Sequence, residues 1–563
     1  MTAATRHVGP QAGPQAGPNV DPITLAVVRG AFEQVAEEMD TVLAASAISP
    51  VIADAWDRAS GIFHPESGEV VAQGATGLPI FIVVMQHTVQ EVIKAHPPDT
   101  MKPGDVFIIN DPYRGGTHVM DVKFVRPFFQ DGRLKAFVAN TGHWPDVGGM
   151  TPGGFTPVST DIYQEGLRLP PVRIIEAGRM NQALLDVMML NMRVAEDRYG
   201  DMAAQLNALE LGCKRLDELF RQWGDAVLYR CIDELRARSE QLMRAHIRSI
   251  PDGTYRFRDE MDSDGVDEGR LIIDLALTVA GDEITFDLSG GSPETRGPFN
   301  SPWSSTVTAL MIGMKHVFWD VPINAGCFVP FHYVVPEGNM FNPRPPRPVS
   351  GTTTETSHRL VGVVMGALAQ AIPDKVPAGF FGTGTNMGLG GTSPTYGRFA
   401  TIFFFGGGYG GHRDGDGLTN GSTTIAASRN SSIEVLEQSV PLLFTRYAVR
   451  DGSAGDGAHR GGLGVEIDFH LRDGEAYLTL VGDRGTSGPH GLGGGHEGQP
   501  ADHDFHTAGK TFKAPHLTKI DRLYLKRGDG CRLRTPGGGG WGDPRARDEA
   551  ARAADRLNGY VRS

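Results

Sequence analysis

The segment Asn110-Asp111-Pro112-Tyr113-Arg114-Gly115-Gly116-Thr117-His118-Val119-Met120-Asp121 leads into two mostly apolar runs, at residues 122–129 and 134–141. Gln130-Asp131-Gly132-Arg133 lies between the two runs. An Asp-Gly pair in this position predicts a β-hairpin with a tight turn, because both central residues of a type I′ turn need positive φ. The second strand of the hairpin therefore returns to the end at which the first strand began.

The register of this hairpin predicts which side chains meet at its open end. With the Asp-Gly pair as the two-residue loop, Asp121 pairs with Gly142, and His143 arrives beside Asp121. His118 lies three residues before Asp121, in the glycine-rich entry loop. Pro127 interrupts the first strand, so a bulge or an edge position is expected to shift the register. A shift of one or two residues leaves the three polar side chains together.

His118, Asp121 and His143 form the chemistry expected of a divalent metal site. Imidazole and carboxylate ligands suit Zn, Mn or Fe. The alternative is a surface hairpin with two solvated histidines.

Three other acidic residues are candidates for a role at this site. Asp111 lies in the entry segment, and Asp146 lies three residues past His143. Either carboxylate is expected to accept a proton if it lies within hydrogen-bond reach of an attacking water. Asp146 is explained equally well as a turn residue after proline. Asp57 precedes the first strand of a second predicted hairpin, where a lone aspartate is more often a turn former.

A loop rich in Gly, Pro and Thr follows this hairpin and runs to Ser159. An ordered loop of this kind beside a metal is suited to form a substrate wall or lid. We expect Trp144, at the start of this loop, and Glu165, in the polar turn beyond it, to contribute to substrate binding.

The composition places the chain among globular proteins and excludes some functions. The 563 residues predict roughly three or four domains, or fewer large ones. A net charge of −13 and a pI near 5.8, without a basic stripe, argue against nucleic-acid binding. We find no apolar run of about 20 residues and no secretory signal, so no membrane association is expected. The four cysteines are scattered and predict reduced thiols in a cytoplasmic protein.

The pattern of apolar residues predicts a mixed α/β (α+β) fold. Residues 1–20 are expected to form a disordered tail, and residues 21–250 a metal-binding α/β domain that includes a helical block at 181–247. In this block Gly200 is expected to break the first of three helices. Residues 251–440 predict a mixed α/β domain, and 441–563 a Gly-rich β domain with a short C-terminal helix.

The chain offers no nucleotide-binding motif. Ala508-Gly509-Lys510-Thr511 resembles the end of a phosphate-binding loop, but the required earlier glycine is Asp504. The glycine run at 406–411 precedes a charged segment that cannot open a helix, so it is not a dinucleotide fingerprint.

Several of these segments together resemble the hydantoinase B family. The matching motifs run in order along nearly the whole chain; they are residues 110–121, 136–139, 143–149, 163–171, 191–193, 324–327, 430–434 and 535–544. The family includes subunits of ATP-dependent N-methylhydantoinases and caprolactamases, the corresponding half of oxoprolinases, and subunits of acetone and acetophenone carboxylases.

This resemblance implies a metal-bearing subunit in a hetero-oligomer with a larger, ATP-using subunit of hydantoinase A type. That partner would bind ATP and phosphorylate the substrate oxygen, which explains why this chain has no nucleotide site. The family's metal ligands map onto Asp57, His118, Asp121 and His143. The resemblance therefore adds Asp57 to the three ligands expected from the hairpin.

The chain departs from the family at two positions beside Pro79. The family commonly carries histidines there, whereas this chain has Gly77 and Phe81. We therefore expect a more apolar wall, to which Phe81 contributes as a substrate-binding residue, and a substrate that is bulkier or aromatic.

Three functions agree with these features. The first is ATP-dependent opening of a cyclic amide such as a hydantoin or lactam. The second is ATP-dependent, biotin-independent carboxylation of a ketone of the acetone or acetophenone carboxylase type. The third is a scaffold that binds the ATP-using partner without activity of its own. The short length favours the first over the second.

Overall fold

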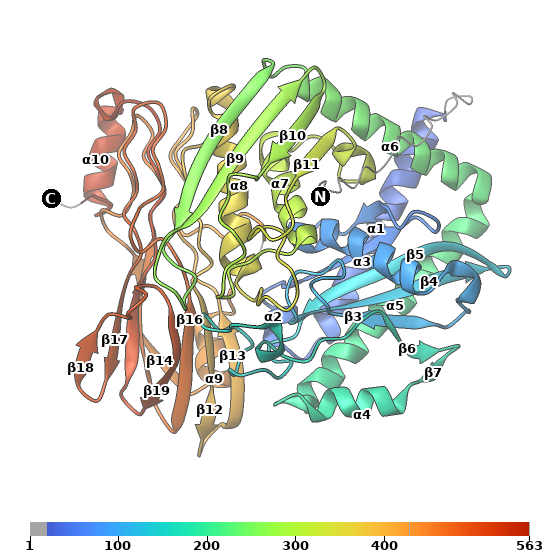
Figure 1. The fold of residues 1–563 in the computed structure, drawn as a ribbon, viewed down its shortest axis with the longest axis horizontal. Helices are drawn as coiled ribbons and strands as arrows, with labels where there is room; N and C mark the ends of the chain where they lie inside the picture. The colour runs from blue at the N-terminus through green and yellow to red at the C-terminus, as the bar shows by residue number, and fades with distance from the viewer. Residues whose placement is uncertain (1–19, 427, 562–563) are drawn as a thin grey trace.

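A computed structural model describes residues 20–426 and 428–561 (Figure 1). Residues 1–19, the greater part of the predicted tail, lie outside this description. The described chain forms four β-sheets and ten α-helices, which confirms the predicted mixed α/β class. The strand-rich C-terminal part lies at one side of the N-terminal sheet and its helices (Figure 1).

The N-terminal half is built on a seven-stranded antiparallel sheet with the order β2-β1-β5-β4-β3-β6-β7. Helices α1 (Pro22–Ser46) and α5 (Ala195–Trp223) pack against each other and on β1 and β5, with the short α2 (Pro50–Ala53) between α1 and the sheet. Helix α3 (Pro79–Ala95) contacts the same two strands and also α7 (Trp303–Val317), which belongs to the second half. The strands are β1 (Arg58–Phe63), β2 (Val70–Gln73), β3 (Val106–Ile109), β4 (Asp121–Gln130), β5 (Arg133–His143), β6 (Val172–Glu176) and β7 (Arg179–Met180).

The central hairpin of this sheet is β4 and β5, as predicted. Asp131 has a φ of 50° and Gly132 a φ of 72°, which are the two positive values that the tight turn requires. A bulge between Phe128 and Phe129, directly after Pro127, shifts the register by one residue. Asp121 therefore pairs with His143 and not with Gly142. The register expected without a bulge was wrong, and the observed shift agrees with the bulge expected at Pro127.

The helical block consists of α4 (Gln182–Leu190), α5 and α6 (Asp225–Ile247). The predicted break at Gly200 was wrong, because Gly200 lies inside α5 and the break falls at residues 191–194. A Cβ atom at Gly200 would lie 2.1 Å from Cγ1 of Ile48. The glycine is therefore a point of close packing between α5 and the segment after α1.

Three smaller sheets form the rest of the described chain, with the strand orders β11-β10-β9-β8, β13-β12-β16-β19 and β14-β15-β20-β17-β18. Helices α7 and α8 (Ser357–Leu368) pack together, α9 (Ile433–Ser439) contacts β14, and α10 (Glu549–Leu557) is the last helix. The strands are β8 (Gly253–Met261), β9 (Leu271–Ala280), β10 (Glu283–Asp287), β11 (Phe331–Val334), β12 (Asn386–Ser393), β13 (Gly397–Phe403), β14 (Leu442–Val449), β15 (Val465–Leu471), β16 (Glu475–Val481), β17 (Asp502–Thr507), β18 (Lys510–Phe512), β19 (Ile520–Lys526) and β20 (Gly530–Arg534).

The segments on either side of the expected domain boundaries contribute to the same sheet or to the same hydrophobic cluster. One sheet joins β12 and β13 with β16 and β19, so it spans the boundary expected at residue 440. Buried side chains from Leu25 to Val481 belong to one hydrophobic cluster, which includes residues on both sides of position 250. The site described below depends on this continuity, because its walls come from both halves.

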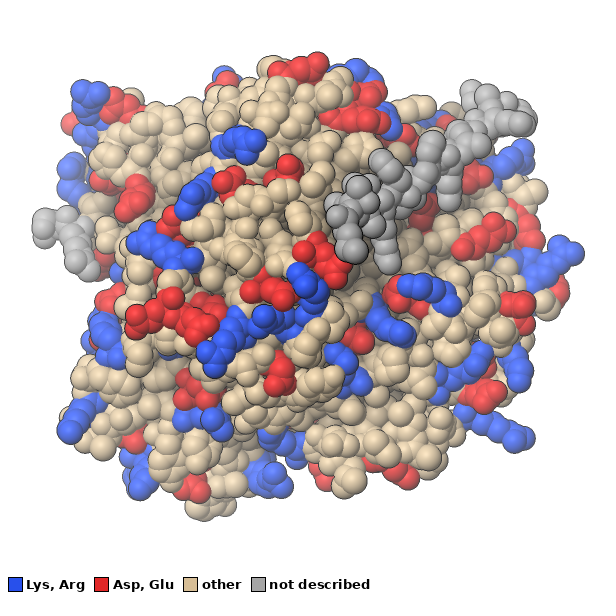
Figure 2. Space-filling view, in the orientation of Figure 1, with Lys and Arg blue, Asp and Glu red and all other residues tan. Residues whose placement is uncertain are grey.

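The surface carries both signs of charge. Figure 2 shows Lys and Arg side chains interspersed with Asp and Glu over the visible face. All four cysteines are buried and unpaired. Within the described residues, every helix is too short or too polar to cross a membrane.

Candidate metal centre

Three of the four candidate ligands are delivered by the central hairpin. Asp121 begins β4 and His143 ends β5, and Nδ1 of His143 lies 3.0 Å from Oδ1 of Asp121. Nε2 of His118, from the entry loop, lies 3.4 Å from Oδ2 of Asp121. One ligand atom from each of the three side chains lies within 4.8 Å of the others. The predicted convergence of these residues is therefore present in the structure.

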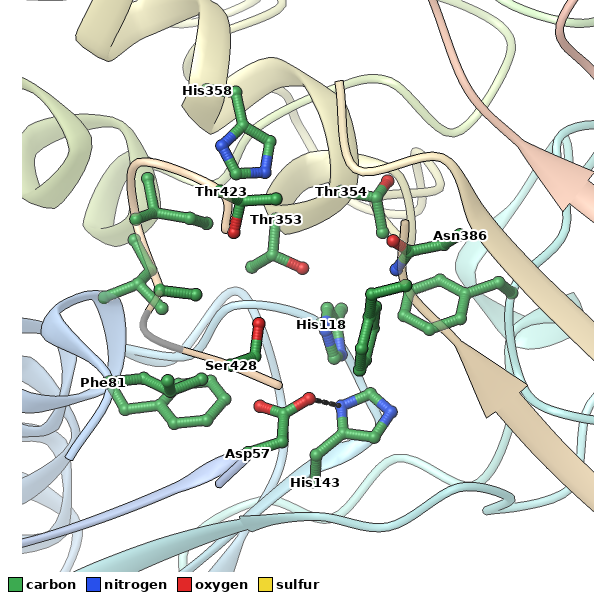
Figure 3. A pocket seen from close by; sticks show the side chains of 16 residues that line it. Asp57, Phe81, His118, His143, Thr353, Thr354, His358, Asn386, Thr423 and Ser428 are labelled. Carbon is green, nitrogen blue, oxygen red and sulfur yellow. Dashed lines mark ion pairs between the residues drawn. The ribbon is translucent and has the colours of Figure 1, made fainter. Parts of the chain in front are cut away.

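Asp57 reaches the same place from the neighbouring strand. It directly precedes β1, which pairs with β5 so that Arg58 lies opposite Gly142. The backbone N–H of His143 donates to the carbonyl oxygen of Asp57 at 3.0 Å. The Asp57 carboxylate then lies 3.9 Å from Nδ1 of His143 (Figure 3). The pairing of β1 with β5 thus places Asp57 beside His143, although the local sequence alone did not favour Asp57 as a ligand.

The four side chains are buried, and their charges act on one another. Burial raises the pKa of Asp57 to about 7, and the nearby charge of Asp121 acts in the same direction. Burial would also raise the pKa of Asp121, but His118, His143 and Lys123 outweigh it and lower this pKa to about 2. Burial lowers the pKa of His118 to about 3. Burial also tends to lower the pKa of His143, but the carboxylates of Asp57 and Asp121 outweigh this effect, so the pKa of His143 is raised.

The donor set fits a divalent metal. The ring nitrogens nearest the Asp121 carboxylate are Nε2 of His118, at 3.4 Å, and Nδ1 of His143, at 3.0 Å. The other ring nitrogens of the two histidines are buried and have no hydrogen-bond partner among the described residues. Two imidazoles and the carboxylates of Asp57 and Asp121 are ligands that Zn, Mn and Fe accept.

Neighbouring groups hold the candidate ligands in place. The hydroxyl of Thr117 donates to Oδ2 of Asp121, and Nζ of Lys123 donates to the backbone carbonyl of Asp121 at 3.0 Å. The ring of Phe155 stacks on His143 with centroids 5.6 Å apart and meets His118 edge-on at 5.5 Å. Phe155 belongs to the glycine-rich loop that the sequence predicted as a wall, and it lines the cavity described next.

A cavity of about 40 Å³ lies over the cluster of candidate ligands (Figure 3). This space holds about three water molecules. Its floor is formed by Asp57, His118 and His143, and its opposite wall comes from residues 353–428. Sequence reasoning missed that wall, because no local pattern connects these residues with the hairpin. The wall residues are Thr353, Thr354, His358, Asn386, Phe404, Thr423, Ile425, Ala426 and Ser428.

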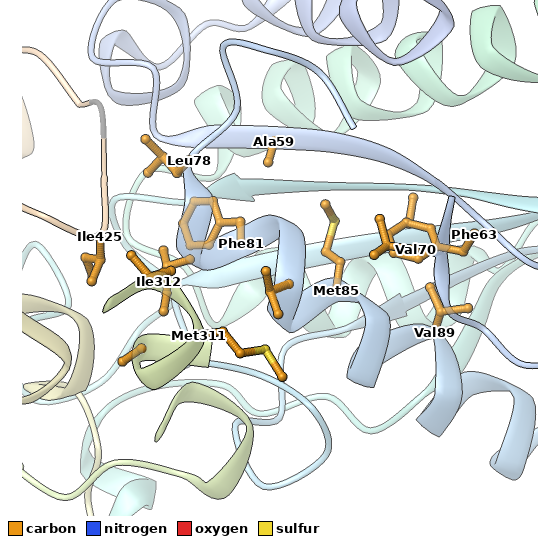
Figure 4. Packing of buried hydrophobic residues seen from close by; sticks show 14 of the residues in the cluster. Ala59, Phe63, Val70, Leu78, Phe81, Met85, Val89, Met311, Ile312 and Ile425 are labelled. Atoms are coloured by element: carbon orange, nitrogen blue, oxygen red, sulfur yellow. The ribbon is translucent and has the colours of Figure 1, made fainter. Parts of the chain in front are cut away.

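Phe81 lines the cavity, as expected, on its apolar side. Figure 4 shows its ring at the start of α3, close to Leu78 and Ile425. Gly77 instead faces the protein interior, where a Cβ atom would lie 3.0 Å from Cβ of Ala59 and 3.3 Å from a carboxylate oxygen of Asp40. The sheet therefore leaves little room for a larger residue at position 77.

Four predicted site residues outside the cluster, Asp111, Trp144, Asp146 and Glu165, do not line this cavity. Arg193 binds both carboxylate oxygens of Asp146 at 3.0 Å, and two backbone N–H groups donate to the same carboxylate. Asp111 lies 3.7 Å from the guanidinium of Arg168. Their roles as proton acceptors stay predictions.

Trp144 and Glu165 are buried in the protein interior. The indole N–H of Trp144 donates to Gln205 at 2.9 Å. Glu165 accepts hydrogen bonds from the backbone N–H groups of Val349 and Ser350 at 2.9 Å each, and so ties the first half of the chain to the second. Their expected contact with substrate also stays a prediction.

Asp40, near Gly77, should make stability depend on pH. Its carboxylate is fully buried, and neither oxygen has a hydrogen-bond partner among the described residues. Burial raises its pKa to about 7, against the opposing effects of Ser60 and Arg58, while Glu37 adds to the rise. Because the pKa of Asp40 is higher in the folded than in the unfolded chain, the free energy of unfolding decreases as pH rises from the pKa of the unfolded chain toward 7.

We therefore expect Asp40→Asn to gain stability over the natural chain as pH increases. The advantage should grow by about 2–3 kcal/mol between pH 5 and pH 8. Urea unfolding of both proteins at the two pH values measures this difference, and other titrating groups cancel in the comparison. An advantage that is equal at both pH values would contradict the prediction.

The chain is similar to known proteins along nearly its whole length. The family model described as Hydantoinase B/oxoprolinase matches residues 21–544. An uncharacterised protein of Methanocaldococcus jannaschii is 32% identical over 94% of this chain and 92% of its own length. A protein of a Pseudomonas species that is named as a putative subunit of a D-/L-hydantoinase is 30% identical over 96% of this chain and 93% of its own. The crystal structure of ATP-dependent caprolactamase from Pseudomonas jessenii superposes with a TM-score of 0.89 at 28% identity, covering 96% of this chain and 95% of that chain.

Proposed function

Because this chain belongs to the hydantoinase B/oxoprolinase family, we propose that it is the metal-dependent subunit of an ATP-dependent hydrolase of cyclic amides. The observation that carries this proposal is the buried cluster of His118, Asp121, His143 and Asp57, of which Asp57, His118 and His143 form the floor of a cavity. The names of two relatives, a hydantoinase subunit and an ATP-dependent caprolactamase, support the reaction class.

The residues of this chain would bind the metal and shape the space above it. Asp57, His118, Asp121 and His143 are the proposed ligands. A divalent metal in such a site supplies Lewis-acid polarisation and lowers the pKa of water toward neutrality. Thr117 fixes the orientation of the Asp121 carboxylate through its hydrogen bond. Bonds of this kind to ligands commonly change metal affinity or activity by about 10–100-fold when they are lost.

The side chains around the ligands would control water and orientation. Phe81 and Phe155 place apolar surface beside the cluster, which limits the water that reaches it. Thr353, Thr354 and Asn386 offer neutral hydrogen-bonding groups from the opposite wall. The arrangement therefore places neutral hydrogen-bonding groups opposite the proposed metal ligands.

The use of ATP would belong to a separate partner of hydantoinase A type. The sequence of this chain contains no phosphate-binding loop. The relative from a Pseudomonas species is itself named as one subunit of an enzyme. We propose that the partner phosphorylates the amide oxygen and that this chain carries the metal needed for hydrolysis.

Metal removal should test both parts of this proposal. The purified chain with its partner is expected to hydrolyse a lactam or hydantoin only when ATP is present. Dialysis against a chelator should abolish hydrolysis, and added Zn²⁺, Mn²⁺ or Fe²⁺ should restore it. A purified chain that holds no metal and binds none would contradict the metal role and support the scaffold alternative. ATP consumption that depends on bicarbonate and a ketone would instead indicate the carboxylase alternative.

A further inference from the structure

A histidine faces the candidate metal ligands from the opposite wall of the cavity. Four of the described residues that line the cavity have titratable side chains, namely Asp57, His118, His143 and His358. The first three belong to the proposed metal cluster. Figure 3 shows His358 on the other side of the cavity from Asp57 and His143. Among the described lining residues, His358 is therefore the one group that can take up or give a proton without being a proposed ligand.

A wide helical turn directs His358 to this wall. Thr352–Thr356 forms a single π-helical turn directly before α8, in which the backbone N–H of Ser357 donates to the carbonyl oxygen of Thr352. Hydrogen bonds in a π-helix join residues five apart, so Thr353 and His358 lie on nearly the same side of the helix. Both residues line the cavity. Single π-helical turns are rare and are frequently found at functional sites.

The ring of His358 is held in place and is uncharged at neutral pH. The residue is 2% exposed, and its Nδ1 lies 3.4 Å from Oγ1 of Thr424. Burial, together with the positive charge of Arg359, lowers the pKa of His358 to about 3. A phosphorylated substrate would bring negative charge into the cavity, and a nearby negative charge raises the pKa of a histidine. The imidazole should therefore become a better proton acceptor when the activated substrate is bound.

The proposed reaction requires a proton to move from oxygen to nitrogen. Addition of water to the phosphorylated cyclic amide forms a carbon–oxygen bond and moves the C=N electron pair to nitrogen. The carbon then carries a hydroxyl, the phosphoryl oxygen and the ring N–H. When the C–N bond breaks, its electron pair stays on nitrogen, which gains a proton and becomes an amine. The hydroxyl loses a proton and becomes the carbonyl of an acyl phosphate, which a second water hydrolyses to a carboxylate and phosphate.

We propose that His358 is a catalytic residue that accepts the hydroxyl proton and donates a proton to the ring nitrogen. This inference rests on the proposed function and assigns the proton transfer that opens the ring. The same intermediate has a second path, in which the bond from carbon to the phosphoryl oxygen breaks, phosphate leaves with the electron pair, and the hydroxyl proton is lost to water. That path regenerates the cyclic amide and consumes ATP without ring opening. Protonation of nitrogen favours ring opening, because an amine leaves more readily than its anion.

The coupling between ATP consumption and ring opening tests the inference. The purified chain with its partner and ATP is given δ-valerolactam or hydantoin as the probe. His358→Gln keeps a polar side chain near Thr424 but cannot carry a proton at this position. We expect this variant to open the ring roughly 100-fold or more slowly than the natural chain, while its consumption of ATP falls much less.

His316→Gln is the matched control. Nε2 of His316 lies 2.7 Å from the carbonyl oxygen of Thr424, so His316 contacts the same residue as His358 but does not line the cavity. The control should keep ATP consumption matched to ring opening. Coupling in His358→Gln equal to that of the control would overturn the inference.

Water labelled with heavy oxygen separates proton transfer from a structural role. On the path that regenerates the amide, the oxygen of water becomes the carbonyl oxygen of the recovered amide. The amide recovered from His358→Gln should therefore carry the label, whereas the natural chain and His316→Gln should place it in the products of ring opening. Equal decreases in ATP consumption and ring opening, without label in the recovered amide, would indicate a structural role and overturn the inference.

A second variant tests the same step by chemical rescue, and it applies even if His358→Gln does not fold. His358→Ala leaves a space of the size of the lost ring, and added imidazole should restore ring opening and its coupling to ATP. Failure of imidazole to restore them would count against the inference. Natural ring opening in either variant would show that the inference is wrong and that the proposed function stands. If the natural complex opens neither probe, the proposed function is wrong and the inference falls with it.

Discussion

Replacing His118 or His143 with alanine is expected to lower ATP-dependent amide hydrolysis by about a thousandfold or more, with loss of bound metal. Each histidine contributes one proposed ligand in a cluster whose donor atoms lie within 4.8 Å of one another. Metal catalysis supplies several kcal/mol of charge stabilisation, and each 1.36 kcal/mol corresponds to about tenfold in rate. Loss of one ligand should therefore remove most of the activity.

Metal content by mass spectrometry and the rate of ring opening measure this effect together. His332→Ala is the matched control, because His332 is half exposed and pairs with Glu283 at the surface. The control should keep both metal and activity. Full activity in His118→Ala would exclude the proposed metal role of the cluster. Loss of metal with full activity would show that the ion is not used in the reaction.

Replacing Arg359 with methionine is expected to cost about 3–5 kcal/mol of unfolding free energy. Its guanidinium lies 2.8 Å from Asp259 on β8 and 2.5 Å from Asp483 after β16, and the Arg359 side chain is completely buried. The charges of Lys519 and Arg359 outweigh burial and hold the pKa of Asp483 well below its usual range. Removing Arg359 would leave Asp259 paired with Arg484 alone and Asp483 with Lys519 alone, and would leave part of their buried negative charge uncompensated.

Urea unfolding of the variant at neutral pH measures this loss. Arg413→Met is the matched control, because Arg413 pairs with Asp374 at 3.1 Å where both side chains are more than half exposed. An exposed pair contributes about 0–1 kcal/mol, so the control should unfold at nearly the natural urea concentration. Equal decreases in the free energy of unfolding in the two variants would show that the buried ion pairs of Arg359 stabilise the fold no more than the exposed pair of Arg413.

The hairpin of β4 and β5 is the part of the fold that sequence predicts best. Its turn residues, its bulge beside Pro127 and its two histidines lie within 26 consecutive positions, from 118 to 143. The interactions that set its geometry are local, since positive φ at Asp131 and Gly132 and the missing N–H of Pro127 act on neighbouring residues. The meeting of His118, Asp121 and His143 follows directly.

The predictions that depended on distant contacts were less complete. Gly200 was expected to end a helix, but Ile48 packs against it and α5 continues. Asp146 stays a predicted proton acceptor, and Arg193 binds its carboxylate from 47 residues away. In both cases the residue contacts a partner remote in sequence.

The sequence by itself determined the mixed α/β class, the central hairpin and the meeting of three proposed metal ligands, because turn chemistry and strand pairing act over short stretches of chain. The family resemblance added Asp57, and strand pairing between β1 and β5 places it beside His143. Only the tertiary structure brought residues 353–428 over the cluster. That wall depends on packing between halves of the chain that are hundreds of residues apart, which no local pattern encodes.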